Sequence, residues 1–203
     1  MPQHPYRTGP STGSVRWPLV LLGAIAVTGL VACAAKQSKT AHGELPVQEG
    51  VELSRYVGTW YEQARLPNSF QKDCQSNVQA HYTLLPENRM WVVNRCKIPA
   101  GEFKSTEGVA RLASQPAPPN PARLQVRFAP EWTSWIPAVW GDYWIIKLDE
   151  SYQYSLVGTP DRKYLWVLTR QKRADQAKVD ELLEYARSLG FAVDEVMRTV
   201  QEG

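Results

Sequence analysis

Apolar and polar residues alternate along several short runs of this chain beyond about residue 50. The alternation is plainest at Val78, Ala80, Tyr82 and Leu84, and again at Leu124, Val126 and Phe128. Because successive side chains of a strand point to opposite faces, this period of two predicts strands with one apolar face and one polar face.

Eight runs of this kind are separated by proline, glycine and asparagine residues. They cover residues 60–65, 77–85, 90–96, 106–113, 123–128, 142–148, 152–158 and 164–169. Short turns at 86–88 and 160–162 join neighbouring runs directly, which predicts sequential antiparallel hairpins.

Near the C-terminus the apolar period changes from two to that of a helix. Val179, Leu182, Leu183, Ala186 and Leu189 share one helical face, and Gly190 follows them. The pattern predicts one amphipathic helix over residues 175–189, because glycine readily adopts the left-handed conformation that ends a helix. Its apolar stripe needs a surface to cover, and the outside of the sheet is available. Residues 191–200 are expected to return as an extended segment.

These elements predict an all-β fold, an eight-stranded antiparallel up-and-down β-barrel with one C-terminal helix packed outside. Closing the sheet into a barrel removes exposed strand edges. The interior of an eight-stranded barrel is either just filled by side chains or holds one small ligand. Composition does not decide between these two.

The N-terminal segment has the layout of an export signal. An apolar run at 19–32 follows a stretch that contains Arg7 and Arg16 and no acid. The run is shorter than the roughly 20 residues that a membrane-spanning helix needs, so we expect it to be cleaved. The four residues ending at Cys33 resemble the lipobox of bacterial lipoproteins, in which the cysteine is lipidated and becomes the new N-terminus. The alternative is an ordinary secretory signal that contains a cysteine.

Cleavage before Cys33 divides the chain into a signal peptide at 1–32, a lipid-anchored flexible tether at 33–50 and one domain at 51–203. The remaining length of about 170 residues suffices for a single core. The formal net charge of the whole chain is only +3, and the signal removes two arginines, so no nucleic-acid partner is expected. Ala34 after Cys33 resembles the neutral residue that directs lipoproteins to the outer membrane.

Cys74 and Cys96 remain once Cys33 is assigned to lipid. In an exported chain a disulfide is the default state of such a pair. Two cysteines alone do not make a zinc site, which needs four ligands at recognisable spacing. We therefore expect neither a metal nor another cofactor.

Three motifs occur in the order found in one known family. Gly58-Thr59-Trp60 opens the first expected strand, Gly141-Asp142-Tyr143 lies in the middle, and residues 164–170 end in Arg170. They resemble the signatures of the lipocalins, and residues 70–74, 93–96 and 152–170 are similar to the bacterial outer-membrane lipocalins, which resemble apolipoprotein D in turn. The resemblance covers about residues 51–201.

Strand alternation also assigns each connection to one end of the barrel. Arg170 is expected to lie over Trp60 at the closed end as a structural clasp, because a guanidinium over an indole face is favourable. The disulfide partners fall at the open end. The other connections expected there are 97–104, 129–141 and 159–163.

The predicted ligand site is the inner face of the barrel. Its lipid-binding wall is expected to comprise Val78, Ala80, Tyr82, Leu84, Asn94, Leu124, Val126, Phe128 and Tyr143. Any of these side chains can equally be core, and the Asn94 amide can bond either a ligand headgroup or a backbone carbonyl. The cavity mouth is assigned to Trp132, Trp135, Trp140, Arg65, Lys97 and Arg162. The tryptophans either plug the barrel or meet acyl chains and the membrane interface, where tryptophan is favoured.

The resemblance implies an outer-membrane lipoprotein without enzymatic activity, which binds a fatty acid or a lysophospholipid and stores or transports it at the cell envelope, with the domain facing the periplasm. A homodimer is compatible with that family. One alternative is a lipid-acting enzyme, an esterase or isomerase, that uses the cavity. Against it, residues 51–203 contain no Gly-x-Ser-x-Gly elbow and a single histidine, His81. The other alternative is a filled barrel that docks a partner protein.

Overall fold

The computed structural model describes residues 43–115 and 117–202. The strands are β1 (Gly58–Arg65), β2 (Ser76–Leu85), β3 (Arg89–Lys97), β4 (Phe103–Leu112), β5 (Arg123–Arg127), β6 (Gly141–Leu148), β7 (Tyr154–Gly158), β8 (Leu165–Thr169) and β9 (Met197–Arg198). The α-helices are α1 (Leu53–Tyr56) and α2 (Gln176–Ser188). Short 3₁₀ turns are η1 (Pro86–Asn88), η2 (Glu131–Thr133), η3 (Pro137–Val139) and η4 (Val193–Glu195).

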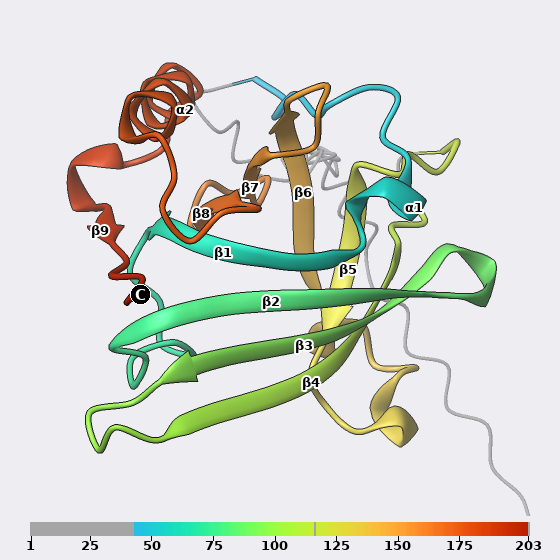
Figure 1. The fold of residues 1–203 in the computed structure, drawn as a ribbon. Coiled ribbons are helices and arrows are strands. Elements are labelled where there is room, and N and C mark those ends of the chain that lie inside the picture. Colours follow the sequence, from blue (N-terminus) through green and yellow to red (C-terminus); the bar gives the residue numbers. More distant parts are fainter. Residues whose placement is uncertain (1–42, 116, 203) are drawn as a thin grey trace, which may run out of the picture. The chain divides into compact units, whose positions relative to one another are not determined.

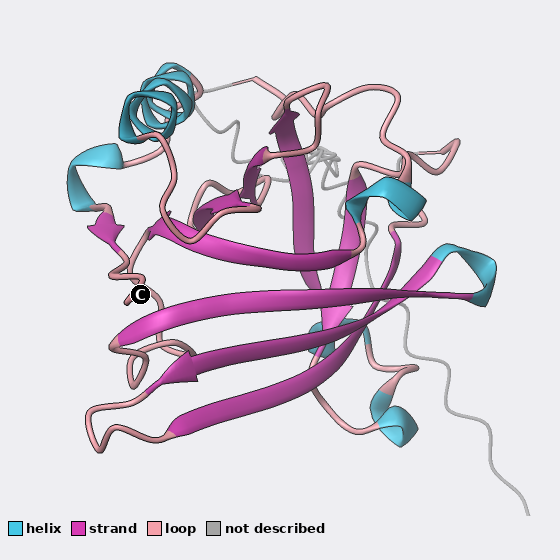
Figure 2. Cartoon of the chain, in the orientation of Figure 1, coloured by secondary structure: helices cyan, strands magenta, loops and turns pink. Residues whose placement is uncertain are grey.

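The strands form one closed antiparallel barrel with up-and-down topology. Each of β2 to β8 pairs with its neighbours in sequence, and β1 closes the ring by pairing with both β8 and β2. The predicted eight-stranded barrel is therefore confirmed. The short β9 adds to β1 outside the ring, in the segment expected to return after the helix. Figure 2 shows the strands curving around a common interior, with the helices at the periphery.

The C-terminal helix lies outside the barrel, as predicted. The Asp175 carboxylate accepts a hydrogen bond from the Ala177 amide and caps the start of α2, and Gly190 adopts φ +90° just after its end. Its apolar side packs against outward-facing residues of β6 to β8 such as Ile146 and Val167. The helix thus covers one outer wall of the barrel (Figure 1).

The closed end of the barrel is filled by a second apolar cluster. Helix α1, which the alternation pattern did not predict, places Tyr56 beneath the barrel next to Trp60, and both side chains are fully buried. Leu124 and Ile145 complete this floor. The interior is therefore solid at one end.

The packed domain begins upstream of Val51, the first residue of the expected domain. Leu45 is only 1% exposed and packs in the cluster beneath α2. The Gln48 amide donates a hydrogen bond to the carbonyl of Ile145 at 2.9 Å. The end of the expected flexible tether is thus part of the domain, because Leu45 fills an apolar position on the barrel wall.

Both apolar clusters and every described element lie within residues 43–202. Lys39–Gly203 forms one compact unit by its internal contacts. The expected signal peptide and Cys33 lie outside the described residues. Within 43–115 and 117–202, no helix has the length and apolar character needed to span a bilayer.

Candidate ligand-binding site

A cavity of about 750 Å³ opens at the end of the barrel opposite α1. Of the predicted wall residues, Val78, Ala80, Tyr82, Asn94, Val126, Phe128 and Tyr143 line it. Its size is within the range of small-molecule sites, and its wall is predominantly apolar with few polar groups, as such sites usually are. The alternative of a barrel filled by its own side chains is therefore wrong for this part of the interior.

Two predicted wall residues do not line the cavity. Leu84 is 42% exposed, because the β2–β3 hairpin extends past the closed end of the barrel (Figure 1). Leu124 points inward but is fully buried in the floor. Alternation had assigned both side chains to the inner face without giving their height along the barrel axis. The same alternation in β3 could have found Met90 and Val92, which do line the cavity.

The tryptophans of the open-end connection divide into two groups. Trp140 lines the cavity, its indole nitrogen donates to the Ser134 carbonyl at 2.8 Å, and the Arg111 guanidinium lies 3.7 Å from its ring centroid. Trp132 and Trp135 are 75% and 78% exposed. They do not plug the barrel, so that alternative is wrong for both.

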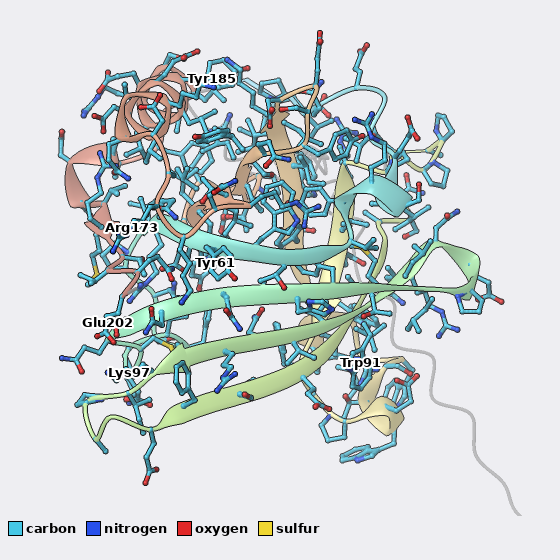
Figure 3. All side chains as sticks on the ribbon, in the orientation of Figure 1. Tyr61, Trp91, Lys97, Arg173, Tyr185 and Glu202 are labelled. Atoms are coloured by element: carbon cyan, nitrogen blue, oxygen red, sulfur yellow. A yellow bond between two sulfur atoms is a disulfide. The ribbon has the colours of Figure 1, made fainter. Side chains whose placement is uncertain are left out.

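The predicted mouth cations are engaged elsewhere. Arg65 is buried and forms a 2.7 Å ion pair with Glu62, and Lys97 pairs with Glu202 at 2.9 Å (Figure 3). Arg162 reaches along the outer wall and donates to the carbonyls of Leu189 and Gly43. None of the three lines the cavity, so this part of the prediction is wrong.

Two cations do stand at the mouth. Lys104, a rim cation expected from its place in the 97–104 connection, and Arg95 both line the cavity. Lys104 pairs with Asp73 at 3.1 Å, and the Arg95 guanidinium lies 3.9 Å from the centroid of the Phe103 ring. Arg95 had no distinguishing signal in the sequence, because its place next to the inward-facing Asn94 predicts an outward side chain.

A disulfide joins Cys74 to Cys96 at the open end, as predicted, with a Cα–Cα distance of 5.5 Å. It fastens the connection between β1 and β2 to the end of β3. Phe70 of that connection lines the mouth, and its ring centroid is 5.4 Å from that of Tyr164. The disulfide thus holds one aromatic side of the opening in place.

Glu62 brings a buried carboxylate to the cavity wall. The Arg65 guanidinium and the Thr199 hydroxyl donate to its Oε1, and the Gln71 amide donates to its Oε2 at 2.7 Å. A buried charge with a close counter-ion and additional donors is satisfied within the protein. We therefore infer that Glu62 stabilises the cavity wall and does not bind the ligand.

Four hydroxyl groups meet at the deep end of the cavity. The Tyr56 hydroxyl lies 3.0 Å from those of Ser155 and Tyr143, and the Tyr143 hydroxyl lies 2.9 Å from that of Tyr82. Burial raises the pKa of Tyr56 to about 12 and raises the pKa values of Tyr82 and Tyr143 further above the ordinary tyrosine value. This region therefore strongly disfavours negative charge.

The described residues offer no arrangement typical of hydrolytic catalysis. His81 lies on the outer face, where its Nδ1 is 2.9 Å from the Thr59 hydroxyl. No cluster of three or more metal-binding side chains occurs in 43–115 and 117–202. The cavity can hold an apolar molecule, with polar contacts at its mouth and at its deep end.

Comparisons with known proteins agree with this geometry. The family model described as a lipocalin-like domain matches residues 51–201. The chain is 34% identical over 163 residues to temperature-induced lipocalin-1 of Arabidopsis thaliana, covering 80% of this chain and 86% of that protein. It is 33% identical over 187 residues to outer membrane lipoprotein Blc of Escherichia coli (strain K12), covering 92% and 97%.

More distant proteins share the same architecture. Apolipoprotein D of Mus musculus is 29% identical over 164 residues, covering 77% of this chain and 80% of that protein. The solved structure of insecticyanin from Manduca sexta superimposes with a TM-score of 0.60 at 18% identity, covering 77% of this chain and 84% of that one. The latter likeness concerns the fold alone.

Proposed function

Since this chain belongs to the lipocalin family, we propose that it binds a lipid, a fatty acid or a lysophospholipid, in its barrel and stores or transports it at the cell envelope. The observation that carries the proposal is the apolar cavity of about 750 Å³ with one open end. Removing an acyl chain from water contributes about 25 cal/mol for each Å² of apolar surface buried. The cavity wall supplies such a surface without any cofactor.

We further propose that lipidated Cys33 anchors the protein to the bacterial outer membrane, with the domain facing the periplasm. The similarity to outer membrane lipoprotein Blc along 92% of the chain supports this assignment. The Gly43 carbonyl accepts a hydrogen bond from Arg162, which belongs to an open-end connection. This contact supports an orientation in which the mouth faces the anchoring membrane.

The two exposed tryptophans fit the same orientation. Trp132 and Trp135 flank the opening on the connection that also supplies Trp140 to the cavity wall. Tryptophan is favoured at the boundary between lipid headgroups and acyl chains, where its ring is buried and its N–H remains hydrated. We propose that this pair contacts the membrane surface while ligand passes through the mouth.

We propose binding rather than catalysis as the activity. Cavity-lining Glu62 is held by Arg65, Gln71 and Thr199, so it is not free to act as a base. The tyrosines at the deep end have raised pKa values because they are buried, which opposes their use as nucleophiles at neutral pH. In this proposal the domain binds its ligand and releases it chemically unchanged.

A binding titration tests the proposal directly. Residues 34–203, which omit Cys33 and contain the whole folded unit, should show saturable quenching of tryptophan fluorescence on addition of lysophospholipid or a fatty acid of 16 to 18 carbons. Trp140 and Trp166 line the cavity and report on its occupation. Absence of saturable change with either class of amphiphile would contradict lipid binding.

A further inference from the structure

The hydroxyl groups at the deep end form a linear chain of hydrogen bonds with a countable number of protons. The order along it is Ser155, Tyr56, Tyr143, Tyr82, contributed by β7, α1, β6 and β2. Four hydroxyls carry four donor protons, and the three contacts between them use three. One proton is left for a partner outside the chain, and any of the four hydroxyls can keep it, because a hydroxyl oxygen can accept two hydrogen bonds.

Burial decides which hydroxyls can keep the spare proton. Ser155 and Tyr56 are fully buried and do not line the cavity, and the Tyr56 hydroxyl is the only hydrogen-bond partner of Ser155 among the described residues. If either kept the spare proton, a buried donor would stay unsatisfied at a cost of about 1–3 kcal/mol. Ser155 therefore donates to Tyr56, and Tyr56 donates to Tyr143. The spare proton then belongs to whichever of Tyr143 and Tyr82 accepts in the 2.9 Å contact between them, and both side chains line the cavity.

The free proton is at the cavity surface. Tyr82 is about 95% buried from solvent, yet its side chain lines the cavity, whereas Ser155 and Tyr56 do not. The surrounding wall is apolar, formed by Ala80, Val92 and Leu168. A ligand that fills this end with hydrocarbon alone leaves the donor without an acceptor.

We propose that the hydroxyl pair of Tyr82 and Tyr143 donates one hydrogen bond to a neutral oxygen of the ligand, so that the preferred lipids carry a hydroxyl or carbonyl group on the part that enters deepest. This inference rests on the proposed lipid-binding function and narrows its ligand class. An acyl chain with an oxygen near its far end, beyond the headgroup at the mouth, has the required chemistry. The contact with this tyrosine pair then selects among lipids of equal length.

The acceptor is neutral because the site penalises anions. The raised pKa values of all three tyrosines reflect burial that disfavours a negative charge here. Arg170, the nearby cation, donates to the carbonyls of Thr59, Tyr56 and Tyr152 and lies over the Trp60 ring. Its donors are thus committed to the closed end of the barrel, so a carboxylate beside Tyr82 lacks a counter-ion.

Calorimetric titration of two matched ligand series tests the proposal. One series consists of fatty acids of 12 to 18 carbons, and the other of the same acids with a hydroxyl on the terminal carbon. Wild-type protein should bind the hydroxylated acid of best-fitting length about fivefold more tightly, relative to its parent acid, than the double variant Tyr82→Phe/Tyr143→Phe does, which is the effect of one net hydrogen bond.

Tyr61→Phe is the control, since it removes a tyrosine hydroxyl from the outer face of β1, away from the cavity. Its preference for the hydroxylated acid should equal that of wild type. Binding of the parent acids by the double variant shows that its cavity is intact, and a preference that is the same in wild type and the double variant would then overturn the proposal. If wild type bound neither series, lipid binding itself would fail; equal binding of both series would reject only the deep acceptor.

Discussion

The guanidinium of Arg170 lies 4.0 Å from the centre of the Trp60 ring at the closed end of the barrel. It also donates hydrogen bonds to the carbonyls of Thr59 and Tyr56 at 3.0 and 3.2 Å. Gly58 adopts φ +95°, a conformation that favours glycine, and a Cβ there would also lie only 3.2 Å from this guanidinium. One residue from the end of the barrel sequence thus fastens the first strand to the helix before it.

Replacing this clasp should destabilise the fold without changing the cavity. Arg170→Ala removes the cation–π contact and leaves carbonyl acceptors unpaired, so we expect the free energy of unfolding to fall by about 3 kcal/mol. Arg170→Lys keeps the charge but not the planar guanidinium, so it should lower the free energy of unfolding by an intermediate amount. Urea denaturation measures both, with exposed Arg173→Ala as the control (Figure 3). Equal effects of the two alanine variants would argue against the clasp.

Narrowing the cavity should abolish binding and leave the fold intact. Asn94 lines the cavity at the middle of β3, whereas its neighbour Val93 points to the outer face. We expect Asn94→Trp to weaken lysophospholipid binding at least tenfold, because the indole occupies space that the acyl chain needs. Val93→Trp adds the same volume outside the barrel. Similar affinities for the two variants by calorimetry would place the ligand elsewhere.

The exposed tryptophan pair should govern association with membranes. Replacing Trp132 and Trp135 by alanine in residues 34–203 removes two large side chains that are mostly exposed. We expect binding to phosphatidylcholine vesicles to weaken at least tenfold, since burial of even one large apolar side chain is worth roughly 1.5–3 kcal/mol and about 1.4 kcal/mol corresponds to a factor of ten. Trp91→Ala, on the outer face of β3 away from the mouth, is the control and should bind as wild type does (Figure 3). If vesicle sedimentation shows that the double variant binds as tightly as wild type, Trp132 and Trp135 do not contact the membrane.

Anchoring by Cys33 is tested on the full chain expressed in a Gram-negative host. Cys33→Ala should prevent lipid attachment, so labelled palmitate should no longer be incorporated into the protein. Ala34→Asp is a second variant and should retain incorporation, because it leaves the thiol in place. Undiminished labelling of Cys33→Ala would show that the lipid is attached elsewhere or that the label is not specific.

The buried tyrosines should make the fold sensitive to alkali. Burial raises the pKa of Tyr56 from 10.0 to about 12, so the folded state holds its proton more tightly than the unfolded state does. The contribution of Tyr56 to the free energy of unfolding is therefore fully present below pH 10 and is lost as the pH rises toward 12. Urea midpoints between pH 9 and 11.5 should therefore fall less steeply in Tyr56→Phe than in wild type. Tyr61→Phe, on the outer face of β1, should retain the wild-type slope (Figure 3).

Apolar periodicity and motif order sufficed to predict the barrel, the outer helix and the contact between Trp60 and Arg170, whereas the disulfide was predicted from the export signal and the two remaining cysteines. These features depend on local rules: the period of two assigns each side chain to a face, and strand alternation assigns each connection to an end. Val78, Ala80 and Tyr82 therefore fell on the cavity wall without knowledge of any contact. Helix α1 escaped prediction because one turn is too short to show a helical period.

Only the tertiary structure decided how far along the barrel axis each side chain lies and which neighbours it contacts. Leu84 has the parity of the inner face but lies beyond the closed end, and Arg65 belongs to the open end but turns to Glu62. Whether the interior is hollow depends on how all strands pack together. The deep hydroxyl chain joins Tyr56, Tyr82, Tyr143 and Ser155 across about a hundred residues of sequence, and no local pattern connects them. The sequence by itself determined which faces turn inward, and only closure of the barrel decided what those faces enclose, since that depends on contacts between residues distant along the chain.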